Sequence, residues 1–272
     1  MVIQHNIAAI NSYRNLSTNQ SALSKNLEKL SSGYKINRAG DDAAGLAISE
    51  TMRSQINGLN QAVNNANDAV GLIQTAEGAM TETHAMLQRM KTLTTQAANG
   101  TYTITARKNI KAEIDALNKE ITRIATTTEF NGEKPLSPKG KNLTFFIGAS
   151  ADASNAMTVA QMTMTAKALT IEQIQVDNTT NAFKAMKSID TAIERVSTYR
   201  ATLGAAQNRL EHTVNNLKVT SENITSAESR IRDTDMADEI TAYTKNNILL
   251  QAAQSMLSQS NAMPQGVLSM LQ

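Results

Sequence analysis

Residues 43–98 read AAGLAISETMRSQINGLNQAVNNANDAVGLIQTAEGAMTETHAMLQRMKTLTTQAA, and they decide the fold because their apolar side chains recur at seven-residue spacing. The first series of apolar residues is Met52, Leu59, Ala66, Ile73, Met80 and Leu87. The second series is Ile56, Val63 and Val70, which turns polar at Glu77 and His84. Alternating three- and four-residue steps place both series on one narrow stripe of a helix roughly 80 Å long. Such a helix needs a partner that covers its stripe.

The expected partner lies in the C-terminal half, where the same spacing returns. The first series there is Ala182, Ile189, Val196, Leu203, Leu210, Leu217, Ile224 and Ile231. The second series is Met186, Ile193 and Val214, interrupted by Arg200, Gln207, Ser221 and Glu228. A third, shorter stripe is formed by Ile110, Ile114, Leu117, Ile121 and Ile124. These patterns predict a mainly α fold, a long antiparallel helical hairpin or coiled-coil rod with a third helix packed against it.

The middle of the chain changes character and predicts a small irregular cap that contains β structure. Asn131-Gly132 and Pro135 are turn signals, and 143–147 is a short strand candidate. Val159 with Met162 and Met164 suggests a second short strand. We therefore expect the cap to occupy residues 136–180, between the rod segments 43–135 and 181–232.

The two ends repeat the helical pattern. An N-terminal stripe stops at Gly33, a natural helix terminator, and Asp41 and Asp42 stand where the next helix needs a cap. A C-terminal helix is expected to run to Met263-Pro264, with Val267, Leu268 and Leu271 beyond it. We expect residues 1–42 and 233–272 to lie together at one tip of the hairpin, with Gly33, Gly40, Asp41 and Asp42 forming the hinge and cap between the inner and outer helices.

Composition excludes several classes of function. Net charge is only +2, and Lys and Arg alternate with Asp and Glu, so no nucleic-acid surface is expected. Cysteine is absent, and the three histidines, His5, His84 and His212, lack metal-ligand spacing, so neither a metal nor a cofactor is expected. We predict that His84 bridges helices instead. No run of roughly 18 apolar residues occurs, which argues against membrane insertion. No catalytic constellation is present, so the chain is not expected to be an enzyme.

The chemistry of the ends suggests polymerisation. No Asp, Glu, Lys or Arg occurs from Leu249 to Gln272, and from Met1 to Tyr13 the only side chain that can gain a charge near neutral pH is His5. A charge-free helix that mixes Leu and Met with Gln, Ser and Asn suits burial against other protein surfaces. It could pair inside the monomer, or pack between molecules. We favour the second alternative, with termini that become ordered only on polymerisation.

The ends also carry a family resemblance. Residues 5–10, HNIAAI, and 30–48, LSSGYKINRAGDDAAGLAI, closely resemble the N-terminal signature of bacterial flagellins. Residues 208–212, NRLEH, 228–233, ESRIRD, and 246–250, NNILL, resemble the C-terminal signature. The resemblance covers roughly residues 1–135 and 180–272. It implies a secreted, self-assembling subunit of the extracellular flagellar filament, serving motility.

The resemblance also implies which residues act and which partners they meet. The terminal helices would form the inner tube of the filament, the rod its outer tube. Implied partners are further copies of the chain, an export chaperone, the type III export apparatus, and the hook–filament junction and filament cap proteins. The residues implied to pack in the filament core are Ile3, Ile7, Ile10, Leu16, Leu23, Leu27, Leu30, Ile240, Leu249, Leu250, Leu257, Val267, Leu268 and Leu271.

Host recognition is implied in part. Leu87-Gln88-Arg89, Leu93 and Glu113 match the motif of flagellins sensed by Toll-like receptor five, whereas Lys91 and Thr92 stand where Arg and Glu are usual. The C-terminal apolar residues resemble those sensed by cytosolic flagellin receptors. The alternative to a filament subunit is a type III-secreted coiled-coil protein, such as a hook–filament junction or adhesin-like factor, which could share the terminal pattern without forming long polymers.

Overall fold

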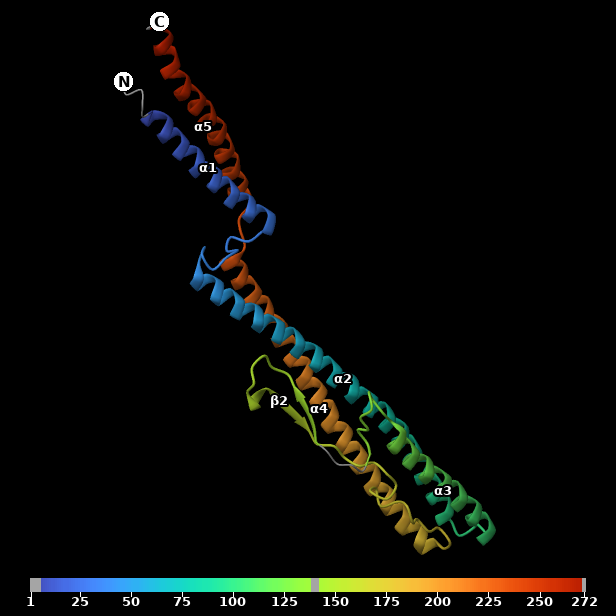
Figure 1. The fold of residues 1–272 in the computed structure, drawn as a ribbon. Coiled ribbons are helices and arrows are strands. Elements are labelled where there is room, and N and C mark those ends of the chain that lie inside the picture. Colours follow the sequence, from blue (N-terminus) through green and yellow to red (C-terminus); the bar gives the residue numbers. More distant parts are fainter. Residues whose placement is uncertain (1–5, 138–141, 271–272) are drawn as a thin grey trace. The chain divides into compact units, whose positions relative to one another are not determined.

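The chain is mainly helical, as predicted. The computed structural model describes residues 6–137 and 142–270. Its elements in chain order are α1 (Ile7–Ser32), α2 (Ala43–Ala98), α3 (Ile104–Thr127), β1 (Leu143–Phe146), the 3-10 turn η1 (Ala153–Asn155), β2 (Ala156–Val159), α4 (Thr179–Arg232) and α5 (Met236–Met270) (Figure 1). Two compact units form: Met1–Ser54 with Glu222–Gln272, called unit 1 below, and Gln55–Ser221, called unit 2.

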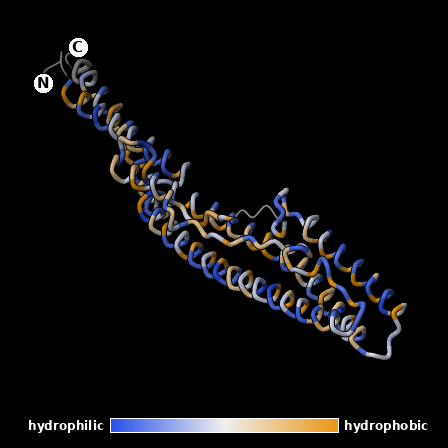
Figure 2. The backbone as a smooth tube through the Cα atoms, turned by 90° about the horizontal axis from the view of Figure 1, so that it is seen from below, coloured by the Kyte–Doolittle hydropathy of each residue, from blue (hydrophilic) through white to orange (hydrophobic). Residues whose placement is uncertain are grey.

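In unit 2, α2 and α4 run antiparallel, which confirms the predicted hairpin. Lys91 Nζ lies 2.7 Å from Asp190 Oδ1, and Arg200 lies 3.4 Å from Glu77 Oε1. Ser221 hydrogen-bonds Asn60 at 3.2 Å. In these pairs the residue number on α4 increases as the residue number on α2 decreases, so the two helices run in opposite directions. Apolar and polar segments alternate along these helices (Figure 2), as expected of amphipathic helices. Glu77 and Arg200, which interrupt the predicted second rows, face each other as an ion pair.

The first predicted heptad rows form the core of unit 2, whereas most of the second rows are wrong by one residue; Val214, at 8% exposed, is buried as predicted. Val63, Val70, Met186 and Ile193 are only partly buried, whereas residues one position earlier are fully covered. The buried second rows are Ala62, Ala69, Ala76, Thr83, Met90 and Ala97 on α2, with Ala185, Ala192, Tyr199 and Ala206 on α4. The buried second rows consist mostly of small alanine side chains, which suit a closely packed core, whereas the larger valines lie at its edge.

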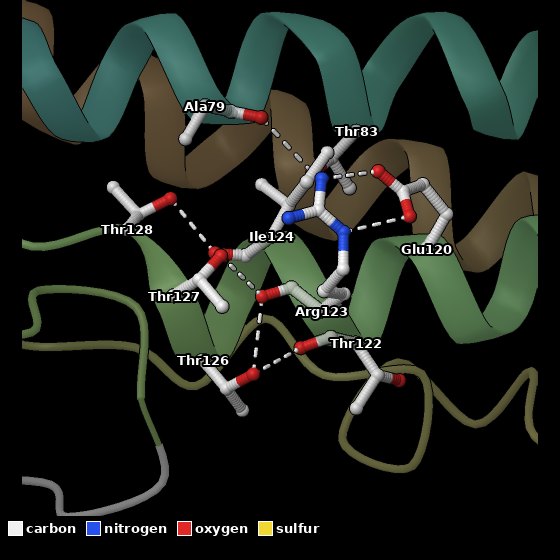
Figure 3. A network of polar contacts seen from close by, with 9 residues as sticks. All are labelled: Ala79, Thr83, Glu120, Thr122, Arg123, Ile124, Thr126, Thr127 and Thr128. Carbon is white, nitrogen blue, oxygen red and sulfur yellow. Dashed lines mark hydrogen bonds and ion pairs between the residues drawn. The ribbon is translucent and has the colours of Figure 1, made fainter.

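Helix α3 covers the open side of the α2–α4 pair. Ile110, Ile114 and Ile121 are buried in the common core. At its C-terminal end, the hydroxyl groups of three consecutive threonines bond to carbonyl oxygens of the preceding turn (Figure 3). The helix ends at Thr128, whose backbone is extended (φ −62°, ψ 118°) and whose N–H and hydroxyl group both donate to the Ile124 oxygen. Threonines that bond back to the helix in this way compete with its continuation.

The central segment forms one antiparallel hairpin, in which Leu143 pairs with Val159 and Phe146 with Ala156. The first strand is where the sequence predicted it. The second begins earlier than predicted, so Met162 and Met164 lie outside it. Met164 is 1% exposed, and its N–H donates to the Leu136 carbonyl at 3.2 Å. Met164 is therefore buried as part of the irregular segment that covers the core, and not as part of a paired strand.

In unit 1, α1 and α5 lie side by side and antiparallel. Asn6 bonds to Ser260 at 2.8 Å, and Lys29 lies 3.8 Å from Glu239. The expected end of the last helix at Met263-Pro264 is wrong, because α5 continues through Pro264 to Met270. The terminal segments are helical in this single chain from Ile7 and up to Met270. Their proposed ordering on polymerisation stays a prediction.

The alanine rows generate a stability prediction. Ala192 is 0% exposed on α4, whereas Ala201 of the same helix is exposed. We expect Ala192→Leu to lower the free energy of unfolding by about 1–3 kcal/mol, because the added atoms must fit into a close helix contact. Ala201→Leu should change it by less than about 0.5 kcal/mol. Urea unfolding followed by circular dichroism measures both, and equal effects would refute the one-residue shift of the seam.

Candidate functional site

The terminal helices expose much of their apolar surface. In α1 only Asn26 is buried, and the groove between α1 and α5 is lined by polar Ser12, Asn15, Thr18 and Asn19 on one side and by Leu249, Ala252, Ala253 and Met256 on the other. Ile7 is 62% exposed and Ile248 is 61% exposed. Other exposed large apolar residues of this pair are Ile10, Tyr13, Leu27, Met236, Ile240, Leu249, Met256 and Met263. A two-helix layer cannot cover both of its faces, so this apolar surface is available to a partner.

The residues predicted to pack in a filament core divide into two groups. Leu16, Leu23, Leu30, Leu250 and Leu257 are partly buried within unit 1. Ile7, Ile10, Leu27, Ile240 and Leu249 remain exposed. Ile3 and Leu271 lie outside the described residues, as do the side chains of Val267 and Leu268. Their role in packing between molecules stays a prediction.

Asn26 supplies a buried polar contact between α1 and α5. With its amide oriented to satisfy both ends, it donates to the Ala22 carbonyl at 2.8 Å and to Glu239 at 3.3 Å. The same amide accepts from Asn246 at 3.2 Å. A buried amide that finds partners on only one alignment of two helices fixes that alignment. Asn26 could not be predicted from the sequence, because an asparagine in a polar helix gives no signal of burial.

The link between the terminal helices and the adjoining ends of α2 and α4, called the joint below, is a short backbone bridge. Gly33 ends α1 with a left-handed φ of 74°, a conformation that glycine adopts at little cost. Its carbonyl accepts from Thr234 N at 3.0 Å, and Lys35 N donates to the Arg232 carbonyl at 2.6 Å. Tyr34 and Asp233 form the antiparallel bridge between the two segments. The predicted terminator at Gly33 is thereby confirmed.

Arg232 holds this bridge to α2. Its guanidinium group lies 4.8 Å from the centre of the Tyr34 ring and forms an ion pair with Glu50. The Arg232 side chain is only 11% exposed, so its charge is mostly shielded from water. A planar guanidinium group can stack on the ring and pair with the carboxylate at once, so it binds this site more strongly than the ammonium group of a lysine would. The sequence places Arg232 within a family signature but does not predict these contacts, because its two partners are remote in the chain.

Of the two aspartates predicted to cap the next helix, only Asp42 does so, whereas Asp41 binds the loop that precedes it. Asp42 accepts from Gly45 N at 2.9 Å and caps α2. Asp41 accepts from the N–H groups of Asn37 and Arg38 at 3.2 and 3.0 Å, which fixes the turn before the helix. Gly40 has no positive φ, and an added Cβ would meet nothing within 4 Å, so no geometric constraint requires glycine there.

Two carboxylates of this joint are shifted toward their charged form. The hydrogen bond from Arg232, followed by the charge of that guanidinium group, lowers the pKa of Glu50 below its ordinary 4.5. Backbone N–H donation from Arg38 and then Asn37 lowers the pKa of Asp41 below its ordinary 3.8. A carboxylate with a lowered pKa stabilises the folded state above its ordinary pKa, and this contribution is lost as the pH falls through the lowered value.

The joint should therefore weaken in acid. We expect Glu50→Gln to lower the thermal midpoint of the chain at pH 7, because Arg232 loses its ion partner. The difference from the unaltered chain should shrink as the pH falls below 4.5 and vanish once the pH is below the lowered pKa of Glu50. Glu222→Gln, an exposed substitution in the same unit, is the control and should show no such convergence. A difference that stays constant throughout the acid titration would contradict the role of the ion pair.

The residues of the receptor motif are placed unevenly. Arg89 and Glu113 form an exposed ion pair, with Arg89 Nη2 2.8 Å from Glu113 Oε1. Lys91 pairs with Asp190 at 2.7 Å. Leu93, however, is 3% exposed within the core of unit 2. The expectation that Leu93 forms a surface contact is therefore wrong, because its side chain faces the core. It supports the helix that carries the motif.

No metal cluster or membrane-spanning helix occurs in the described part of the chain. His84, predicted to bridge helices, instead hydrogen-bonds Gln88 of its own helix at 3.0 Å. Asp235 caps the start of α5, because its side chain accepts from Ala237 N at 2.9 Å.

Comparison with known proteins identifies a family whose members resemble this chain. Residues 3–141 match the bacterial flagellin N-terminal helical region, and residues 186–271 match the corresponding C-terminal helical region. The chain is 50% identical to a flagellin of Bacillus subtilis and 45% identical to flagellin FlaB2 of Treponema pallidum, in each case over all of both chains. The crystal structure of Bacillus cereus flagellin is similar with a TM-score of 0.51 and 33% identity, covering 61% of this chain and 94% of that one.

Proposed function

The chain belongs to the bacterial flagellin family, and we infer that it is a structural subunit that assembles with copies of itself into a flagellar filament. The observation that carries this inference within the molecule is the exposed apolar surface of α1 and α5. The family is a structural one, and we infer no catalytic role. Its place is the bacterial flagellum, outside the cell.

Assembly follows from the chemistry of that surface. Apolar side chains on the outer faces of α1 and α5 would lose contact with water when copies of the chain cover them. Different patches that meet head to tail and side to side generate a helical filament when the rotation does not close. Amide and hydroxyl groups along the α1 side of the groove can hydrogen-bond between subunits, which suits a charge-free interface.

We propose a division of labour along the chain. Segments 1–42 and 233–272 would form the inner core of the filament, segments 43–135 and 181–232 the rod around it, and 136–180 a small cap on the rod. The joint at Gly33, Asp41 and Asp42 would connect core and rod. The two compact units support this proposal, since one of them combines both terminal helices.

Polymerisation provides the direct test. Purified chain seeded with filament fragments should grow filaments of micrometre length in the electron microscope, because each added subunit exposes the same surface again. Short oligomers that stop growing would contradict the proposed function.

A matched pair of variants tests which unit drives growth. Ile248→Ser removes a 61% exposed side chain from α5 of unit 1, and Ile104→Ser removes a 70% exposed one from α3 of unit 2. We expect the first to raise the critical concentration about tenfold or more, since burial of such a side chain contributes about 1.5–3 kcal/mol. The second should change it by less than about twofold. Equal effects would argue against assembly through the terminal helices.

We also propose that the chain is exported through the flagellar type III apparatus while a cytoplasmic chaperone covers its C-terminal helix. The exposed apolar residues of α5, among them Ile240, Leu249 and Met256, support a requirement for such cover before assembly. Hook–filament junction and filament cap proteins would be its neighbours at the ends of the filament.

Recognition by Toll-like receptor five would use the exposed pair Arg89 and Glu113. A receptor carboxylate that binds Arg89 must compete with Glu113 for the same guanidinium group. We expect Arg89→Ala to lower receptor activation at least about fivefold in a reporter assay, because charged anchors dominate such contacts. Arg209→Ala, an exposed arginine on α4, is the control. Unchanged activation by Arg89→Ala would remove this motif from the proposed contact.

A further inference from the structure

A proline near the end of α5 leaves one backbone carbonyl without its helical partner. In an α-helix the N–H of each residue donates to the carbonyl four residues earlier, and proline has no N–H. Pro264 lies inside α5, so the carbonyl deprived of its donor is that of Ser260. Ser260 is only 7% exposed, so water has little access to this residue. The continuation of α5 beyond Pro264 needs another donor at this point.

Asn6 supplies that donor from the other end of the chain. Its Nδ2 donates to the Ser260 carbonyl oxygen at 2.8 Å, across 254 positions of sequence. The same side chain caps α1, because its Oδ1 accepts from Ala9 N at 3.1 Å. One amide therefore satisfies an unpaired acceptor of α5 and an unpaired donor of α1.

The chemistry selects asparagine for both tasks. Serine, threonine and aspartate also cap helices well, since each offers an oxygen to the first turn. None of them offers an N–H donor on the far side of that oxygen, whereas an amide group carries both. Asparagine at position 6 and proline at position 264 are therefore matched.

We propose that Asn6 and Pro264 form a clasp that fixes the register of α1 on α5 and so positions the apolar faces of both helices for assembly. The proposal rests on the proposed function, because it assigns Asn6 as a positioning residue for filament growth. The clasp and the buried Asn26 hold the helix pair near opposite ends of α1. Between them, the pair has little buried apolar surface to set its alignment.

The competing interpretation is that Asn6 is only a helix cap. The variants Asn6→Ser and Pro264→Ala separate the two. A serine at position 6 keeps a capping oxygen and loses the amide donor. An alanine at position 264 restores an N–H that donates to the Ser260 carbonyl within α5, which makes the outside donor unnecessary.

The experiment compares seeded filament growth of four proteins: the unaltered chain, Asn6→Ser, Pro264→Ala and the double variant. We expect Asn6→Ser to raise the critical concentration about fivefold when Pro264 is present, as expected for one lost hydrogen bond to a buried carbonyl. In the Pro264→Ala background the same substitution should raise it less than about twofold, because α5 then satisfies the carbonyl itself. A simple cap predicts a small and equal effect in both backgrounds.

Either an unchanged critical concentration for Asn6→Ser or an equal rise in both backgrounds would overturn the clasp. Both results can be told apart from an error in the proposed function. If the proposed function is wrong, the unaltered chain itself grows no filaments from seeds. In that case hydrogen exchange at the amides of residues 7–12 in the four monomers decides the matter. The clasp predicts faster exchange for Asn6→Ser only where Pro264 is retained, and equal exchange would refute it.

Discussion

The structure depends on the close antiparallel contact of α2 and α4 within unit 2. Each helix buries one row of large aliphatic residues and one row made mostly of alanine, whose small side chains suit a closely packed core. A narrow stripe on a long helix gains little stability alone, because its other faces remain in water. The α3 helix and the central segment complete the core that this seam begins, and Glu77 with Arg200 places an ion pair at its edge.

Unit 1 is organised differently, because polar contacts rather than a core align its helices. Asn6 links α1 to α5 near one end of the pair, and Asn26 and Lys29 link them near the other through Glu239, while most large apolar residues of the pair stay exposed. Hydrogen bonds to buried groups are directional, so they specify alignment even where they contribute little net stability. The joint follows the same principle, with Arg232 held between the Tyr34 ring and Glu50.

This contrast explains why the molecule suits a polymer. A unit that filled its own core would have no strong reason to bind copies of itself, whereas a pair of aligned helices with bare apolar faces gains stability when copies cover them. The membership of the chain in the flagellin family agrees with that physical interpretation. Within the proposed receptor motif, the same packing leaves Arg89 and Glu113 exposed and buries Leu93 in the core of unit 2.

The sequence by itself determined the helices, their antiparallel pairing and most caps, because heptads, glycine terminators and aspartate caps act within a few residues of one another. Only the tertiary structure decided which residues face the seam, since valine and alanine one position apart differ by the space that the partner leaves. It alone joined Arg232 to Tyr34 and Glu50, and moved Met164 from a strand into the core. It also carried α5 past Pro264, because the donor that replaces the missing N–H comes from Asn6, at the opposite end of the chain.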